Sequence, residues 1–395
     1  MEPIRAATPH HADDLARLRR VFEATMGVPA TEGNSVTVLR NGDAIFPAML
    51  DAIRTAERCI DFLTFVYWTG DIAVAFADAL AERARAGVRV RVLLDALGSH
   101  EMDAVLVDRM RASGVVVERF RPPSWRVWEV DHRTHRKILV CDEVVAFTGG
   151  VGIAQEWCGD AGSPDEWRDT HFRITGPAVD GLRAGFLDNW LETHQPLWDD
   201  DVEQFPIHAQ DGTSTLQVIR GDAEVGWNRT TALKRALIRV ARERLRITTP
   251  YFAPDDVTYD LLVAAAERGV AIDVLVPGPH ADKRVAQLTS ERRYEDLLDA
   301  GVRIWRYQPS MLHAKVLTVD GRLADIGSSN FNHRSFHLDE EIDVVILDPA
   351  VVATLDQHMD DDLARSEPVQ EADWDDRGLA QRAAEAASRV VDPQA

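Results

Sequence analysis

The chain has 395 residues, of which 65 are acidic and 44 basic, so its formal net charge is -21. The length is sufficient for two domains, and a hydrophobic content of 45% excludes an extensively disordered chain. An acidic protein repels phosphate backbones at long range, which argues against a dedicated nucleic-acid-binding protein. Because salt screens such fields within about 10 Å, one local basic site for a phosphate ester remains compatible with this charge.

The N-terminus, MEPIRAATPHHADD, has no basic segment followed by an apolar core. No run approaches the roughly 18 apolar residues of a membrane span. The sequence therefore predicts neither a signal peptide nor a transmembrane segment. We expect a cytoplasmic protein that contacts only the surface of the membrane, at the inner face of the cell membrane. Cys59, Cys141 and Cys158 have no metal or redox spacing, so we interpret them as reduced thiols in apolar surroundings.

The predicted elements of the first half alternate between helix and strand. After a helical extension over residues 1–35, the pattern predicts a helix over 46–58 and a strand over 60–66. A helix over 72–86 that ends at Gly87 and a strand over 88–94 follow. A further helix ends at Gly114, and a short strand covers 115–120.

The second half repeats this order. Helices are predicted over 230–244 and 257–268, strands over 245–249 and 270–276, then a helix ending at Gly301 and a strand over 302–307. This alternation predicts an α/β fold of two domains related by a pseudo-two-fold axis, each a mixed, largely parallel sheet flanked by helices. We expect the first domain over 36–205, the second over 206–366, and an acidic, helical tail over 367–395.

Each half contains one His-x-Lys-x₄-Asp motif, HRKILVCD at 135–142 and HAKVLTVD at 313–320. The two histidines, the two lysines, the two aspartates and the glycines Gly149 and Gly327 each lie 178 positions apart. Residues two apart on a strand face the same side, so each His and Lys can address one ligand. The aspartates, Asp142 and Asp320, are expected in the turns after the strands.

A pseudo-two-fold axis would bring His135, Lys137, His313 and Lys315 to one point. Lysines neutralise the non-bridging oxygens of a phosphodiester. One neutral imidazole can attack phosphorus, and the other, protonated, can give its proton to the leaving alkoxide. This division of labour requires neighbouring groups to push the two histidine pKa values apart. The sequence therefore predicts a phosphodiesterase or phosphatidyltransferase with one site built from both motifs.

The paired motifs resemble those of the phospholipase D superfamily, and the wider pattern resembles its bacterial cardiolipin synthase branch. The matching segments are 131–137, 147–150, 167–171, 176–179, 249–252, 327–330 and 334–335. The resemblance implies that His135 is the nucleophile and His313 the acid. It also implies that Asn330 and Ser328 bind phosphate, and that Glu341 and, as its counterpart in the first half, Asp169 orient the histidines.

The first half departs from the branch pattern at two positions. Gly152 stands where the branch has Asn, and Gly150 stands where the second half has Ser328. We therefore expect Gly150 and Gly152 to line the substrate site through the backbone, since glycine permits close approach.

The favoured function is cardiolipin synthase, which converts two phosphatidylglycerol molecules to cardiolipin and glycerol through a phosphohistidine. The alternatives are a hydrolytic phospholipase D that gives phosphatidic acid, a nuclease of the same superfamily and a lipid-binding module without activity. We expect a monomer that takes a phospholipid substrate and binds neither a nucleic acid nor a cofactor. A zinc site at His132, His135 and His171 is the less favoured interpretation, so no metal is predicted.

Two further segments each have one functional and one purely structural interpretation. The Pro-rich loop over 120–128 contains Trp125 and Trp128, which can meet lipid headgroups or pack at the domain junction. The basic stretch over 282–293 can hold an anionic substrate or form a solvated helix face.

Overall fold

A computed structural model describes residues 11–122, 132–197, 206–210, 212–222, 228–282 and 294–370, with the side chains of residues 11–13 left aside. The loop tryptophans Trp125 and Trp128, the basic stretch from residue 283 to 293 and the tail from residue 371 lie outside the described residues. No helix in the described ranges is both long and apolar enough to cross a bilayer.

The described ranges of the first half contain seven strands, and helices alternate with the first four of them in the predicted order. The strands are β1 (Thr31–Arg40), β2 (Cys59–Thr64), β3 (Arg89–Asp95), β4 (Val116–Phe120), β5 (Ile138–Cys141), β6 (Val145–Gly149) and β7 (Thr170–Thr175). The helices are α1 (His11–Met26), α2 (Asn41–Thr55), α3 (Asp71–Arg85), α4 (Ala104–Ala112), the 3₁₀ turn η2 (Gln155–Trp157) and α5 (Ala178–Trp190).

The second half repeats this order of elements. Its strands are β8 (Ser214–Gly221), β9 (Arg244–Thr248), β10 (Phe252–Ala253), β11 (Ala271–Pro277), β12 (Arg303–Tyr307), β13 (Val316–Val319), β14 (Leu323–Gly327), β15 (Phe331–Asn332), β16 (Glu341–Leu347) and β17 (Ser366–Pro368). Its helices are α6 (Arg229–Val240), α7 (Asp256–Glu267), α9 (Tyr294–Asp299), α10 (His333–His337) and α11 (Pro349–Leu363). Side chains of Asn228, Asp255 and Asp348 cap three of them.

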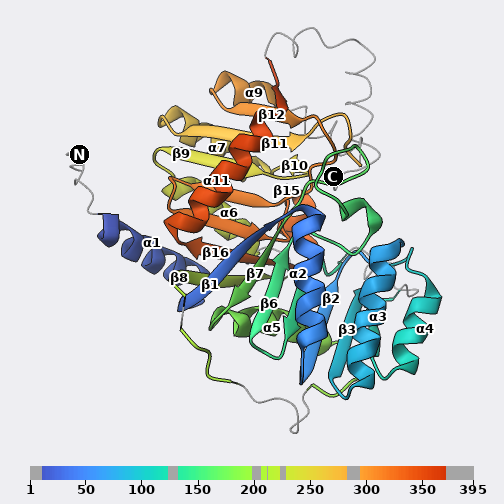
Figure 1. Ribbon diagram of the computed structural model, residues 1–395. Coiled ribbons are helices and arrows are strands. Elements are labelled where there is room, and N and C mark those ends of the chain that lie inside the picture. Colours follow the sequence, from blue (N-terminus) through green and yellow to red (C-terminus); the bar gives the residue numbers. More distant parts are fainter. Residues whose placement is uncertain are drawn as a thin grey trace.

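The two halves form one continuous sheet of fifteen strands (Figure 1). Its order is β17-β12-β11-β9-β13-β14-β16-β8-β1-β7-β6-β5-β2-β3-β4. Reading outward from the central β8–β1 pair, equivalent strands of the two halves follow in the same order. This arrangement confirms the predicted α/β fold with two related halves. The strand β1 begins at Thr31, within the segment predicted as an extension.

The direction of the strands corrects one part of the fold prediction. Parallel pairing in the large sheet is confined to β2–β3–β4 and β9–β11–β12. The remaining neighbours run antiparallel, including β5 with β2 and β6, and β13 with β9 and β14. The expectation of a largely parallel sheet was wrong because the motif strands return through tight turns, whereas parallel neighbours need a crossover helix.

Helices cover both faces of the sheet and divide the core into layers. The helices α2, α3 and α4 pack on the first half, and α6 and α7 pack on the second. A central cluster joins the halves, because Phe186 of α5 and Leu355 of α11 pack with Ile138, Ile326 and other strand residues. The N-terminal helix α1 inserts Phe22 and Met26 into the core of the second half. Two of the three thiols, Cys59 and Cys141, are buried as expected.

Candidate active site

Both motif histidines lie just before a strand rather than inside it. His135 and Lys137 precede β5, and His313 and Lys315 precede β13. The segment does not continue the ladder of its own half because its backbone pairs with the other half. The N–H of His135 donates to the carbonyl of Glu340 at 2.9 Å, and the N–H of His313 donates to the carbonyl of Arg168 at 2.7 Å.

The two orienting carboxylates therefore cross between the halves. His135 Nδ1 lies 3.0 Å from Glu341 Oε1, and His313 Nδ1 lies 2.8 Å from Asp169 Oδ2. The sequence left open which carboxylate serves which histidine, and in the structure each histidine contacts the carboxylate of the opposite half. A carboxylate on Nδ1 holds the proton there and leaves Nε2 free for chemistry.

Glu341 is surrounded by donors from the second half. The hydroxyls of Ser328 and Ser335 both donate to its carboxylate, on opposite oxygens. Burial raises the pKa of Glu341, while Lys137 and these hydroxyls oppose that rise. Because both oxygens accept hydroxyl protons, the bond to His135 is donated by the imidazole. Ser328, predicted to bind phosphate, thus acts on the site through Glu341. Ser335 is a positioning residue for the same carboxylate, and the short Arg334-Ser335 match to the family indicated it only weakly.

Asp169 is held by an indole instead of hydroxyls. Trp157 Nε1 donates to Asp169 Oδ2 at 2.9 Å. Burial alone raises the pKa of Asp169, but the hydrogen bond from His313 and the charges of His313 and Lys315 outweigh it and lower the pKa. Position 157 lies 178 residues before Ser335, so the tryptophan takes the place of the second-half hydroxyl. Trp157 is not among the residues predicted for the site, although this offset marks it.

Aromatic rings enclose the histidines unequally. The His313 ring lies edge-on to Trp157 with centroids 5.2 Å apart, and Trp167 lies 5.4 Å from it. The His135 ring meets Phe65 edge-on at 5.1 Å. Both histidines are buried, so water is largely excluded from each imidazole.

The two lysines supply positive charge, and burial lowers their pKa values, so this charge is lost at a lower pH than usual. Lys137 Nζ donates to the carbonyl of His135 at 2.7 Å, and Lys315 Nζ lies 3.0 Å from His313 Nε2. Burial lowers the pKa of Lys137 to about 8 and that of Lys315 to about 7. The charge of Lys137 further lowers the pKa of Lys315, so the structure brings the two motifs into electrostatic contact.

Both histidine pKa values move in the same direction, which corrects the expectation that neighbours would push them apart. Burial, and then Lys137, lowers the pKa of His135 well below its usual range. Burial, and then Lys315, lowers the pKa of His313 to about 4, against the opposing effect of Asp169. Both imidazoles are therefore neutral near pH 7 when no anion is bound. A phosphodiester in the site would oppose the lysine charges and raise the pKa of the acid.

The motif aspartates lie at the other ends of their strands, in the turns as predicted. Asp142 accepts the backbone N–H groups of residues 57, 58 and 59 at 2.8, 2.8 and 3.0 Å. Asp320 accepts those of residues 242, 243 and 244 at 3.0, 2.8 and 2.8 Å. Each aspartate has a positive φ, 53° and 52°, and ties its turn to the start of a neighbouring strand. Their catalytic role stays a prediction, and the contacts that the structure shows for them hold the fold together.

Close contacts in the turn after β6 explain why Gly150 and Gly152 stand where the second half has larger residues in the turn after β14. A Cβ at Gly150 would lie 2.2 Å from Asp169 Oδ1, and one at Gly152 would lie 2.6 Å from Val66 Cβ. The N–H of Gly150 is already donated to the carbonyl of Thr170 at 3.3 Å, so it does not replace the missing phosphate donor. On the second-half side, Asn330 Oδ1 is buried and has no hydrogen-bond partner in the described part of the chain. An amide oxygen only accepts, so the predicted contact with phosphate would have to be donated by Nδ2 of this side chain.

The geometry does not support a zinc site at His132, His135 and His171. Within the described ranges, no three His, Cys, Asp or Glu side chains converge as metal ligands. His135 Nδ1 is instead engaged with Glu341.

The sequence matches the family described as "Cardiolipin synthase, PLD-like domain" over residues 49–157 and 235–363. Cardiolipin synthase 1 of Bacillus anthracis is 31% identical over 95% of this chain and 75% of its own length. Cardiolipin synthase A of Pseudomonas fluorescens is 32% identical over 93% of this chain and 76% of its own length.

The fold is similar to that of solved structures. Phosphatidylserine synthase of Haemophilus influenzae superimposes with a TM-score of 0.72 over 95% of this chain and 97% of that chain, at 16% identity. Polyphosphate kinase of Porphyromonas gingivalis superimposes with a TM-score of 0.58 over 100% of this chain and 56% of that chain, at 13% identity. Together with the family match, the paired motifs and the crossed histidine–carboxylate pairs identify the chain as an enzyme of the phospholipase D-like family, in its cardiolipin synthase-like branch.

Proposed function

We propose that this protein is a phosphatidyltransferase that makes cardiolipin and glycerol from two molecules of phosphatidylglycerol. The observation that carries the proposal is the crossed arrangement, in which Glu341 orients His135 and Asp169 orients His313. It provides one nucleophile, one proton-transfer group and two lysines at a single phosphodiester. The cardiolipin synthases among the relatives support the choice of substrate.

In the first step, His135 Nε2 attacks the phosphorus of phosphatidylglycerol. A P–N bond forms, the P–O bond to the headgroup glycerol breaks, and His313 gives its proton to the departing glycerol oxygen. Lys137, Lys315 and Asn330 stabilise the charge on the non-bridging oxygens. The product is a phosphatidyl group on His135, with His313 left neutral.

In the second step, the headgroup hydroxyl of another phosphatidylglycerol attacks phosphorus. His313 takes the hydroxyl proton as the new P–O bond forms and the P–N bond breaks. Cardiolipin leaves, His135 is restored, and His313 carries the proton needed for the next cycle.

The carboxylates support this assignment of roles. The lowered pKa of Asp169 keeps a negative charge beside His313, which favours the protonated imidazole once substrate is bound. Glu341 receives hydroxyl donors from Ser328 and Ser335, which spread its charge. His135 therefore remains the neutral partner with a free Nε2.

The same proposal covers the partners of the protein. All groups of the site come from one chain, which supports an active monomer. A phospholipid substrate requires contact with a membrane surface, which we place at the inner face of the cell membrane.

The test is incubation with phosphatidylglycerol in a buffer without divalent ions, followed by mass spectrometry of the lipids. Cardiolipin together with free glycerol supports the proposal. Phosphatidic acid as the main product would instead assign a hydrolytic phospholipase D, and cleavage of DNA without conversion of lipid would assign a nuclease.

A further inference from the structure

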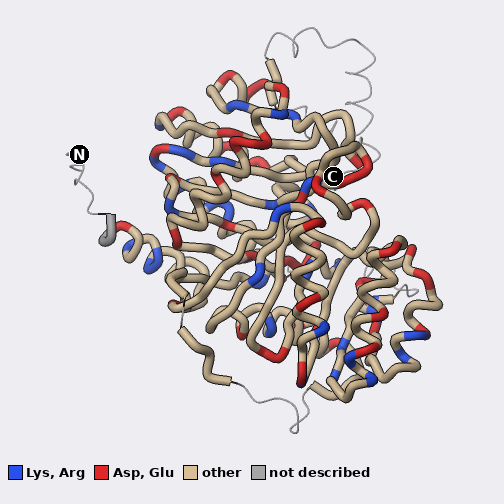
Figure 2. The backbone as a smooth tube through the Cα atoms, in the orientation of Figure 1, with Lys and Arg blue, Asp and Glu red and all other residues tan. Residues whose placement is uncertain are grey.

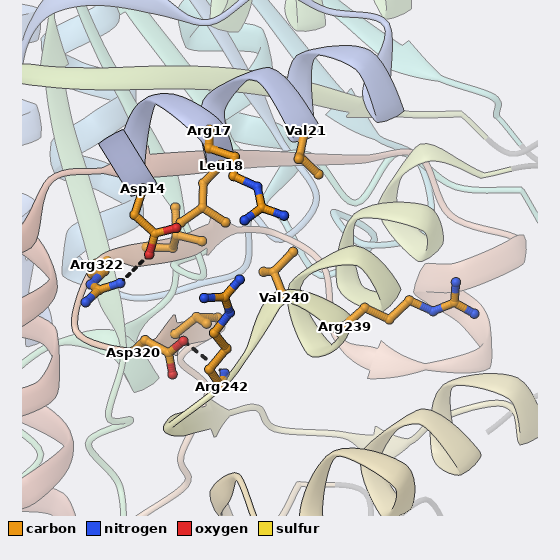
Figure 3. Close-up of a pocket in the computed structure, with 11 residues that line it drawn as sticks. Asp14, Arg17, Leu18, Val21, Arg239, Val240, Arg242, Asp320 and Arg322 are labelled. Carbon is orange, nitrogen blue, oxygen red and sulfur yellow. Dashed lines mark hydrogen bonds and ion pairs between the residues drawn. The ribbon is translucent and has the colours of Figure 1, made fainter. Parts of the chain in front are cut away.

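A cavity with two converging arginines lies between α1 and the second half, away from the motif histidines (Figure 3). Its volume is about 190 Å³. Arg17 of α1 and Arg242, which follows α6, point into the same space from opposite sides (Figure 3). The other lining residues are Asp14, Leu18, Val21, Arg239, Val240, Val319, Asp320, Arg322 and Leu323.

The acidic residues of this cavity are already engaged. Asp14 pairs with Arg322 at 2.5 Å, and Asp320 accepts three backbone N–H groups. Neither Arg17 nor Arg242 forms an ion pair with any residue that the structure describes. Two guanidinium groups that face one space without a carboxylate between them repel each other, and an anion placed there would relieve that repulsion.

An apolar groove adjoins the arginines. It measures about 420 Å³ and shares Val21, Arg239 and Val240 with the cavity. Ala232, Ala236 and Val257 add to its apolar lining. Val21 and Val257 are among the exposed large hydrophobic residues of the described chain. A cationic pocket that opens into an apolar groove complements a ligand with an anionic head and a hydrocarbon tail.

The position separates this feature from the active site. Asp320 lines the cavity and follows β13, whereas His313 precedes that strand. Seven residues of extended chain separate the two by roughly 20 Å. The overall charge of -21 makes a local cationic pocket stand out, and Figure 2 shows basic residues along α1.

We propose that α1 and α6 form a docking site for one anionic phospholipid of the membrane surface, with its phosphate between Arg17 and Arg242 and an acyl chain in the groove. The site would hold the enzyme on an anionic membrane while substrate enters the separate catalytic site. Because it uses no catalytic group, the proposal is independent of the assigned reaction.

The test is co-flotation of the full-length His135→Ala protein, which cannot turn over lipid, with vesicles of phosphatidylglycerol or of phosphatidylcholine. The R17Q/R242Q pair should weaken partition onto phosphatidylglycerol vesicles by about tenfold or more, since each basic residue near an anionic surface contributes appreciably. Val257→Asn should weaken it without removing charge. The matched control R54Q/R109Q loses the same charge from exposed positions on α2 and α4, together with the exposed Arg109–Asp78 ion pair, and should bind as the parent does.

Equal partition of R17Q/R242Q and R54Q/R109Q would overturn the proposal. So would equal binding to both kinds of vesicle. In the otherwise wild-type protein, R17Q/R242Q should keep full activity on a short-chain substrate in solution, which separates a docking defect from a failure of the proposed reaction.

Discussion

The two histidines of the site are held by different neighbours. Two serine hydroxyls bind the carboxylate of Glu341, whereas a tryptophan indole binds that of Asp169. The 178-residue offset predicts the symmetry of the histidines and lysines, but it does not reveal which carboxylate serves which imidazole. That pairing depends on the backbone bonds that His135 and His313 each make with the other half.

The crossed pairing predicts distinct defects for the two carboxylates. Glu341→Gln should slow attack by His135, so it should lower kcat about 10²-fold or more with any leaving group. Asp169→Asn should impair proton donation by His313, and a phosphatidyl ester with an acidic leaving group should restore much of the rate of the first step. The burst of released leaving group in the first turnover, measured on both substrates, checks this. Rescue of Glu341→Gln but not of Asp169→Asn by the acidic leaving group would reverse the pairing.

The lysine pKa values predict the alkaline limit of activity. A lysine is charged below its pKa, so the binding charge is present at pH 6 and declines as pH rises through about 7 for Lys315 and about 8 for Lys137. We expect KM for phosphatidylglycerol to rise between pH 7 and pH 9. Bound substrate stabilises the charged lysines, so kcat should change less. A KM that stays constant to pH 9 would contradict this.

The motif aspartates are predicted to affect stability rather than chemistry. Asp142→Ala or Asp320→Ala leaves three backbone N–H groups without their acceptor, so the free energy of unfolding should fall by about 2 kcal/mol. Asp142→Asn keeps one acceptor oxygen and serves as the milder control. Thermal unfolding and activity per folded molecule check this. An unchanged Tm together with lost activity would return the aspartates to the catalytic group.

At the scale of elements, the turns after β6 and β14 show which local features can be predicted from the sequence and which cannot. The shared offset pairs Gly149 with Gly327, and each glycine is the last residue of its strand. Sequence cannot show that a side chain at Gly152 would collide with Val66, because that residue lies in the loop after β2. The missing asparagine is therefore a packing requirement, which only the folded chain reveals.

Trp157, in the turn η2, should tune the His313 pair. Trp157→Phe keeps a ring beside His313 but removes the N–H bond to Asp169. Loss of a hydrogen bond to a charged group corresponds to about tenfold in kcat, and the acidic limb of the pH profile should move upward as the pKa of Asp169 rises. Trp167→Phe changes a neighbouring ring without that bond and is the control. Equal profiles for the two variants would contradict this role.

The positions of most helices and strands follow from periodicity and glycine ends. The helices predicted over 72–86 and 257–268 correspond closely to α3 and α7. Strand direction does not follow from such patterns. An apolar run of the length of β5 or β13 has the same appearance in a parallel or an antiparallel neighbour, so the share of parallel pairing was overestimated.

At the scale of the whole molecule, the site depends on both halves at once. The strands β1 and β8 join the halves into one sheet, and the central cluster of Ile138, Ile326 and Leu355 belongs to both. The predicted domain limits at residues 205 and 206 remain a prediction. Since each imidazole is oriented from the opposite half, neither half contains a complete catalytic pair.

The most direct test of the account is to find the covalent intermediate. The His313→Ala protein is incubated with a phosphatidyl ester that has an acidic leaving group, and its peptides are examined by mass spectrometry. The first step needs no proton donor with this substrate, whereas the second step lacks its base, so a phosphatidyl group should accumulate on His135. Turnover by the His135→Ala protein, or an adduct on any other residue, would contradict the account.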